Sequence, residues 1–228
     1  MRAMRISVFI IIFLFGIGGG ARGENGILMV DRFPEGLNSE GIPPGWKLEK
    51  TPGPSSKILI EKDKEDRFLC LHSVSDGFGV RKAMSFEIRK YPYLSWWWKA
   101  SQLPKGGDIR KRETDDQAGQ IYVIFPRFPS LANSRSMGYI WDTLAPVGQA
   151  GTSTAYSKMK YVVLQSGASK LNQWIFETRN VYEDYKKYFQ EEPPPVGAVL
   201  LYINSQHTQS SAECCFTEIF FSTQPYKP

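Results

Sequence analysis

The sequence predicts an all-β fold, an antiparallel β-sandwich of the jelly-roll kind with one short helix. Short apolar stretches recur along the chain, and loops rich in Gly, Pro and polar residues separate them. Several stretches alternate polar with apolar residues, as half-buried strands do. With 228 residues, 42% hydrophobic and 14% aromatic, the chain is long enough for one domain with its own core.

The N-terminal residues 1–23 are predicted to be a secretory signal peptide. Arg2 and Arg5 precede an apolar run at 6–17, and small residues follow before the expected cleavage point. The run is shorter than the ~20 residues of a membrane-spanning helix, so no stable transmembrane anchor is expected. The mature chain, 24–228, is therefore expected to be one periplasmic or secreted domain.

The charge of the mature chain argues against nucleic acid as a partner. The full chain has a formal charge of +5, and loss of Arg2, Arg5 and Arg22 leaves 25 basic against 23 acidic residues. Nucleic-acid binding needs a concentrated basic surface. The basic run at 105–112 meets acidic residues directly, so it is interpreted as a solvated loop.

The first half of the chain is expected to supply six strands. They lie at 27–33, 46–50, 57–61, 68–73, 77–88 and 93–100. The charged turn between the third and fourth predicts a hairpin. The sixth strand does not alternate, which places it near the middle of a sheet.

The second half is expected to supply six more strands and the helix. The strands lie at 121–125, 139–141, 159–165, 173–181, 199–203 and 214–221. Val181, Tyr185 and Phe189 have helical spacing, and the triple proline Pro193–Pro195 ends the helix.

Three consecutive tryptophans mark the stretch 93–125. Successive strand residues face opposite ways, so Trp96 and Trp98 point to one face and Trp97 to the other. A sandwich buries one face of each sheet. An apolar second face would therefore need a cover, a ligand or a partner.

The cysteine pattern gives no metal site and leaves the pairing open. Cys214 and Cys215 are adjacent and face opposite ways, so Cys70 can pair with either of them, or all three can be buried thiols. Neither CxxC nor Cys/His metal spacing is present.

A series of motifs resembles the bacterial family DUF3047. It comprises the Trp-rich strand, Asp115-Asp116, Tyr139-Ile140-Trp141, Gln165-Ser166-Gly167, Trp174 and Arg179–Tyr185. The resemblance covers about residues 27–222. It implies an exported protein without assigned activity, with a shape similar to carbohydrate-binding β-sandwiches.

The chain departs from the family pattern at two places. Where relatives tend to have an Asp-rich turn, this chain has Asn204-Ser205-Gln206-His207-Thr208, so a cation or ligand held there in relatives would lose its carboxylates. The glycine expected after the helix is Gln190.

The aromatic residues Trp96, Trp98, Tyr122, Tyr139 and Trp141 are candidates for a ligand groove. Indole and phenol rings can stack on sugar rings. The alternative is that they pack in the core, as strand aromatics usually do.

Polar candidates are Asp115, Asp116 and Arg179. The carboxylates suit sugar hydroxyls or Ca²⁺; alternatively they bond backbone N–H groups of a turn. Arg179 can clamp an acidic ligand or pair internally with Asp184, Glu183 or Asp115.

These features predict a non-catalytic protein that binds a polysaccharide or another envelope component. No catalytic residue is assigned, because His72 and His207 share no motif and no nucleophile elbow is present. Two alternatives stay open: a glycoside hydrolase or lyase on the same scaffold, and an envelope scaffold protein.

Overall fold

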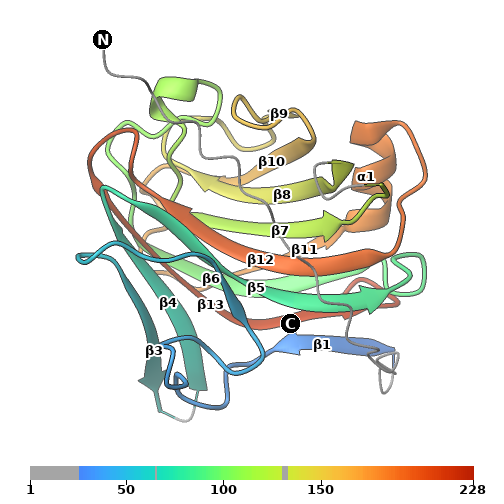
Figure 1. The fold of residues 1–228 in the computed structure, drawn as a ribbon, viewed down its shortest axis with the longest axis horizontal. Coiled ribbons are helices and arrows are strands. Elements are labelled where there is room, and N and C mark those ends of the chain that lie inside the picture. Colours follow the sequence, from blue (N-terminus) through green and yellow to red (C-terminus); the bar gives the residue numbers. More distant parts are fainter. Residues whose placement is uncertain (1–25, 65, 130–132) are drawn as a thin grey trace.

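The computed structural model describes residues 26–64, 66–129 and 133–228, so the predicted signal peptide lies outside the described residues. Two β-sheets pack face to face, which confirms the predicted β-sandwich (Figure 1). No described helix is long and apolar enough to cross a membrane.

One sheet has six strands in the order β11-β6-β13-β4-β3, with β1 paired to β13. Its members are β1 (Ile27–Asp31), β3 (Lys57–Asp63), β4 (Asp66–Val74), β6 (Tyr93–Gln102), β11 (Ile175–Asn180) and β13 (Ser211–Ser222). The predicted hairpin is present, because β3 pairs antiparallel with β4. The tryptophan strand β6 lies inside this sheet, as its unbroken apolar sequence predicts.

The other sheet has seven strands in the order β2-β5-β12-β7-β8-β10-β9. Its members are β2 (Lys47–Lys50), β5 (Gly77–Phe86), β7 (Gly119–Phe125), β8 (Arg135–Asp142), β9 (Ala150–Thr152), β10 (Met159–Ser166) and β12 (Val196–Asn204). The short strand β9 and the 3₁₀ turn η1 (Arg112–Thr114) are not predicted by the sequence pattern.

One pair of strands departs from the antiparallel rule. Strand β10 runs parallel to β8, whereas the other pairs among the described strands are antiparallel. Parallel neighbours need a crossover connection of about a dozen residues or more. The chain between β8 and β10, residues 143–158, is long enough to make it and contributes β9 on the way.

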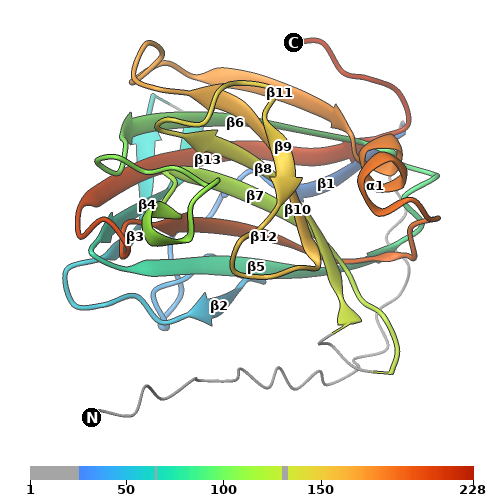
Figure 2. The same ribbon diagram turned by 90° about the horizontal axis from the view of Figure 1, so that it is seen from above.

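The helix α1 (Val181–Phe189) lies at one end of the two sheets (Figure 2). The Asn180 side chain caps its first turn by accepting a hydrogen bond of 3.1 Å from the Glu183 amide. Gln190 ends the helix in the left-handed conformation, with φ of 56°. That conformation explains why glycine suits this position, since glycine adopts it with less strain.

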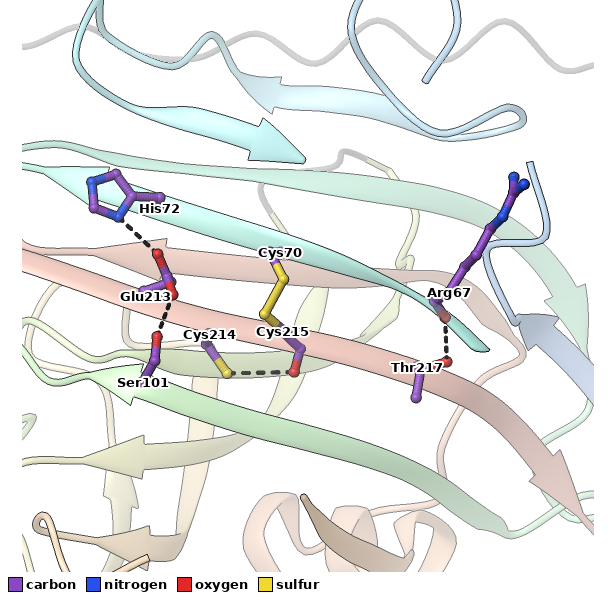
Figure 3. Close-up of a disulfide and its surroundings, with 8 residues drawn as sticks. All are labelled: Arg67, Cys70, His72, Ser101, Glu213, Cys214, Cys215 and Thr217. Carbon is purple, nitrogen blue, oxygen red and sulfur yellow. Dashed lines mark hydrogen bonds and ion pairs between the residues drawn. A yellow bond between two sulfur atoms is a disulfide. The ribbon is translucent and has the colours of Figure 1, made fainter. Parts of the chain in front are cut away.

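A disulfide joins Cys70 to Cys215, which settles the pairing that the sequence leaves open (Figure 3). The two residues are direct cross-strand partners on β4 and β13. Their side chains point to the outer face of the six-stranded sheet. Cys214 points the other way, into the core, and is a buried free thiol.

Candidate functional site

Four of the predicted groove residues lie in the core between the sheets. Trp96, Trp98, Tyr139 and Trp141 are each 0% exposed. Their rings form one cluster, with centroids 5.6 Å apart for Trp96 and Tyr139 and 5.6 Å apart for Trp98 and Trp141. A ligand cannot reach these rings, so the predicted groove is corrected: the core-packing alternative holds for all four.

Arg179 is used for an internal ion pair. Its Nε and Nη2 atoms donate to the two carboxylate oxygens of Asp184 at 3.0 and 2.7 Å, and the Tyr139 hydroxyl donates to the same carboxylate at 2.8 Å. Burial alone would lower the pKa of Arg179, but the Asp184 carboxylate raises it above its usual value. This contact links the junction of β11 and α1 to β8. The internal ion pair, which was the alternative to a ligand clamp, is therefore correct for Arg179.

Tyr122 is the one predicted aromatic residue on an outer face. It belongs to a cluster outside the main core, on the outer side of the seven-stranded sheet, together with Tyr161 and Tyr202. The alternation of side chains places Tyr122 on the same face of β7 as Gln120. It likewise places Tyr202 on the same face of β12 as Asn204.

Each of these three tyrosines is paired with a glycine on the neighbouring strand. The register joins Tyr122 to Gly138, Tyr161 to Gly151, and Tyr202 to Gly79. These pairs define what we call the tyrosine face.

The rings fill the space that a side chain on each glycine would need. A Cβ at Gly138 would overlap the Tyr122 ring, one at Gly151 would lie 2.9 Å from the Tyr161 hydroxyl oxygen, and one at Gly79 would lie 2.7 Å from Tyr202 Cδ2. The three aromatic rings therefore lie across the adjacent strands instead of standing away from the sheet.

Asp115 lies at one end of the tyrosine face, in a network of buried amides. Its carboxylate accepts hydrogen bonds from Gln117 Nε2 at 3.0 Å and Thr154 Oγ1 at 3.3 Å. Asn204 donates to the Asp115 carbonyl oxygen and also accepts a bond from Gln120. Burial raises the pKa of the Asp115 carboxyl above its usual range, although its two donors act in the opposite direction.

Asp116 stabilises a backbone turn. Its carboxylate accepts backbone N–H bonds from His207 at 3.2 Å and Thr208 at 2.6 Å. The turn 204–208 is the one for which the family resemblance predicts an Asp-rich pattern. Asp116 therefore holds that turn, and the alternative of a backbone-bonding aspartate is correct for it.

Because Asp115 and Asp116 serve different partners, they do not form the facing pair that a glycosidase requires.

The tyrosine face is closed on one side and open on the other. Ile109 and Ala145 pack over the β8–β10 side, and Tyr122 and Tyr161 are only 5% and 3% exposed. On the β12 side, Leu200 and Tyr202 are half-buried and reach solvent. The accessible part of the face is thus the strip over β12 and its edge toward Asp115.

The described residues offer no carboxylate cluster for a cation. The group of three potential ligands found among them is Glu61, Cys70 and Cys215, and its two sulfur atoms are already joined in the disulfide. Neither Asp115 nor Asp116 belongs to such a group in the described part of the chain.

The fold and the site define the class of this protein: a β-sandwich with an aromatic outer face on its larger sheet. Residues 44–220, more than half of the chain, match the family described as "Protein of unknown function (DUF3047)". The chain belongs to this family. No protein of curated function matches the sequence.

The chain is also similar to several solved structures, at TM-scores below 0.5. The family 11 carbohydrate-binding module of cellulase Lic26A-Cel5E of Clostridium thermocellum has a TM-score of 0.46 and 9% identity, over 88% of this chain and 96% of that chain. The family 30 module of Cel9D-Cel44B, from the same bacterium, has a TM-score of 0.45 and 11% identity, over 86% and 98%. The agarase AgWH50C has a TM-score of 0.40 and 8% identity, over 90% and 25%.

Proposed function

We propose that this protein is an exported, non-catalytic glycan-binding protein of the cell envelope, and that a sugar chain binds along the tyrosine face. One observation carries the proposal: the tyrosine face is open over β12, where Leu200 and Tyr202 are half-buried, while the buried rings of Tyr122 and Tyr161 form its floor. The open strip presents apolar surface, and the apolar faces of pyranose rings stack on such surfaces.

The open strip supplies both kinds of contact that a sugar needs. Tyr202 and Leu200 offer apolar surface, while the carboxylate of Asp115, a residue that is 8% exposed, lies at one end as a hydrogen-bonding partner. The more deeply buried Tyr122 fixes the floor of the strip, because its hydroxyl donates to Gln120 Oε1. A ligand would therefore meet a preformed surface, which reduces the entropy lost on binding.

Export is supported by two features of the chain. Residues 1–23 have the order of a signal peptide. The Cys70–Cys215 disulfide also fits an oxidising compartment, where such bonds persist. Cell fractionation tests this part: the full chain should appear in the periplasm or medium, and a chain lacking residues 1–23 should stay in the cytoplasm.

Glycan binding is tested with immobilised polysaccharides and peptidoglycan fragments, followed by calorimetry on any that retain the protein. Tyr202→Ala should weaken binding by about tenfold, equivalent to ~1.4 kcal/mol. The matched control is Tyr188→Ala, a half-buried tyrosine on the helix α1, away from the tyrosine face. Retention on none of the glycans, or equal losses in the two variants, would count against the proposal.

A further inference from the structure

The outer face of the six-stranded sheet is a second aromatic surface. Trp97 on β6 and Phe176 on β11 are direct cross-strand partners, with ring centroids 5.2 Å apart. Trp174, just before β11, packs edge-on against Phe68 of β4 at 5.0 Å. Trp97, Trp174 and Phe176 are all half-buried, so each keeps part of its ring in solvent.

Lys99 is held in the middle of this surface by two aromatic rings. Its ammonium nitrogen lies 5.0 Å from the ring centroid of Phe68 and 5.0 Å from that of Trp174. The backbone of Lys99 pairs with Cys215, so the disulfide belongs to the same cross-strand row. Within the described part of the chain, Lys99 forms no ion pair with a carboxylate. A half-buried cation between rings is therefore left without an anion.

The acidic residues near Lys99 either have hydrogen-bonding partners of their own or lie at the edge of this surface. Glu213 accepts a hydrogen bond from Ser101 and contacts His72 Nδ1 at 3.2 Å (Figure 3). Glu61, on the edge strand β3, is exposed and lies within 4.8 Å of both cysteine sulfur atoms. Neither carboxylate forms an ion pair with Lys99. Glu61 lies beside the disulfide, whose Cys215 is the cross-strand partner of Lys99, so its negative charge opposes an incoming anion.

We propose that this second face binds an acidic polysaccharide, a chain of uronic-acid units. The sugar carboxylate pairs with the Lys99 ammonium, and the pyranose ring stacks on Trp174 or Trp97. The attraction is strengthened because Phe68 and Trp174 remove part of the water around the cation. The site is separate from the tyrosine face, since it lies on the other sheet, and it does not depend on the function proposed there.

The test compares one acidic and one neutral probe on the full mature protein. Oligogalacturonate is the acidic probe and a galacto-oligosaccharide of equal length is the neutral one, both titrated by calorimetry at low and at 0.5 M salt. Oligogalacturonate should bind more tightly, and the added salt should weaken it. Tyr202→Ala should leave this binding unchanged, which separates failure at one face from failure at the other.

Charge variants locate the site on the second face. Lys99→Gln should weaken oligogalacturonate binding by about five- to tenfold, and Lys99→Arg should retain most of it. Glu61→Gln should strengthen it by about twofold, because a nearby repulsive charge is removed. Lys90→Gln, an exposed lysine in the turn before β6, is the matched control and should change nothing.

Three outcomes would overturn the proposal. The first is equal binding of the two probes, and the second is unchanged binding in a folded Lys99→Gln variant, with folding checked by near-ultraviolet circular dichroism. The third is a stable dimer in sedimentation analysis that Trp97→Ala dissociates, which would make the face an interface between copies of this chain.

Discussion

The aromatic residues inside the sandwich differ from those on its outer faces in what they are free to do. Trp96 and Trp98 are completely buried and contact rings from the opposite sheet. Trp97, between them in sequence, is half-buried on the outer face. Three identical residues in a row thus divide into two that hold the sheets together and one that can contact a ligand. Aromatic content alone does not distinguish packing from binding.

The sharpest test of this difference is to remove one tryptophan from each layer. Trp98→Ala should lower the free energy of unfolding by about 3–5 kcal/mol, because it leaves a cavity between the sheets. Trp97→Ala, on the same strand, should cost only about 1 kcal/mol. Urea denaturation measures both, and Trp98→Phe serves if the alanine variant does not fold. Equal losses of stability would mean that the buried and the outer tryptophan contribute equally to the free energy of unfolding.

Removal of the disulfide tests whether the outer face of the six-stranded sheet contributes to stability. Replacing Cys70 and Cys215 together by alanine should lower the free energy of unfolding by about 2–5 kcal/mol, since the bond closes a loop with a sequence separation of 145. The measurement is again urea denaturation, without reductant. In the control, Cys214→Ala removes a buried thiol and no crosslink, so its cost should be smaller.

A glycine substitution tests the tyrosine face itself. Gly138→Ala should cost about 1–3 kcal/mol and displace the Tyr122 ring, because the added methyl group overlaps it. Thermal melting measures the loss of stability, and glycan titration measures the effect of the displaced ring on binding. Gly36→Ala is the matched control, since nothing lies within 4 Å of the position its Cβ would take. An unperturbed Gly138→Ala protein would show that the ring does not need the glycine.

The smallest expected effect concerns Asp115. Its carboxyl pKa is raised by burial, so the folded chain binds the proton more tightly than the unfolded chain, and stability falls as the pH rises through this window. Asp115→Asn should therefore stabilise the protein at pH 7, and the gain should shrink as the pH falls toward 4. Melting temperatures at several pH values measure this, with the exposed Asp63→Asn as control. A gain independent of pH would exclude the burial explanation.

Most of the fold follows from the sequence because local patterns report which residues form strands. The helix with its Asn180 cap, the hairpin of β3 and β4, and the interior position of β6 all depend on neighbours in the sequence. The parallel pair of β8 and β10 depends on how a long connection crosses the sandwich. No short-range pattern contains that information.

The candidate site is less predictable because it depends on register. Tyr122, Asp115 and Asp116 can be selected from sequence, but the sequence does not show that Tyr161 and Tyr202 join them. Tyr202 meets Gly79 through strand pairing across 123 residues of sequence, whereas Gly138 and Gly151 lie 16 and 10 residues from their tyrosines. A glycine inside a strand is the one available signal, since it often marks a close approach by another group. Among the three glycines, Gly79 carries that signal, because it lies inside the predicted strand 77–88.

The position of the last two strands sets when this protein can fold. Strand β12 lies between β5 and β7, and β13 lies between β6 and β4, so each sheet receives a central strand from the C-terminal end of the chain. A ribosome-bound chain that stops before Val196 lacks the middle of both layers at once. Neither sheet can form its full strand order before β13 has been synthesised, so we expect the sandwich to fold only after that point.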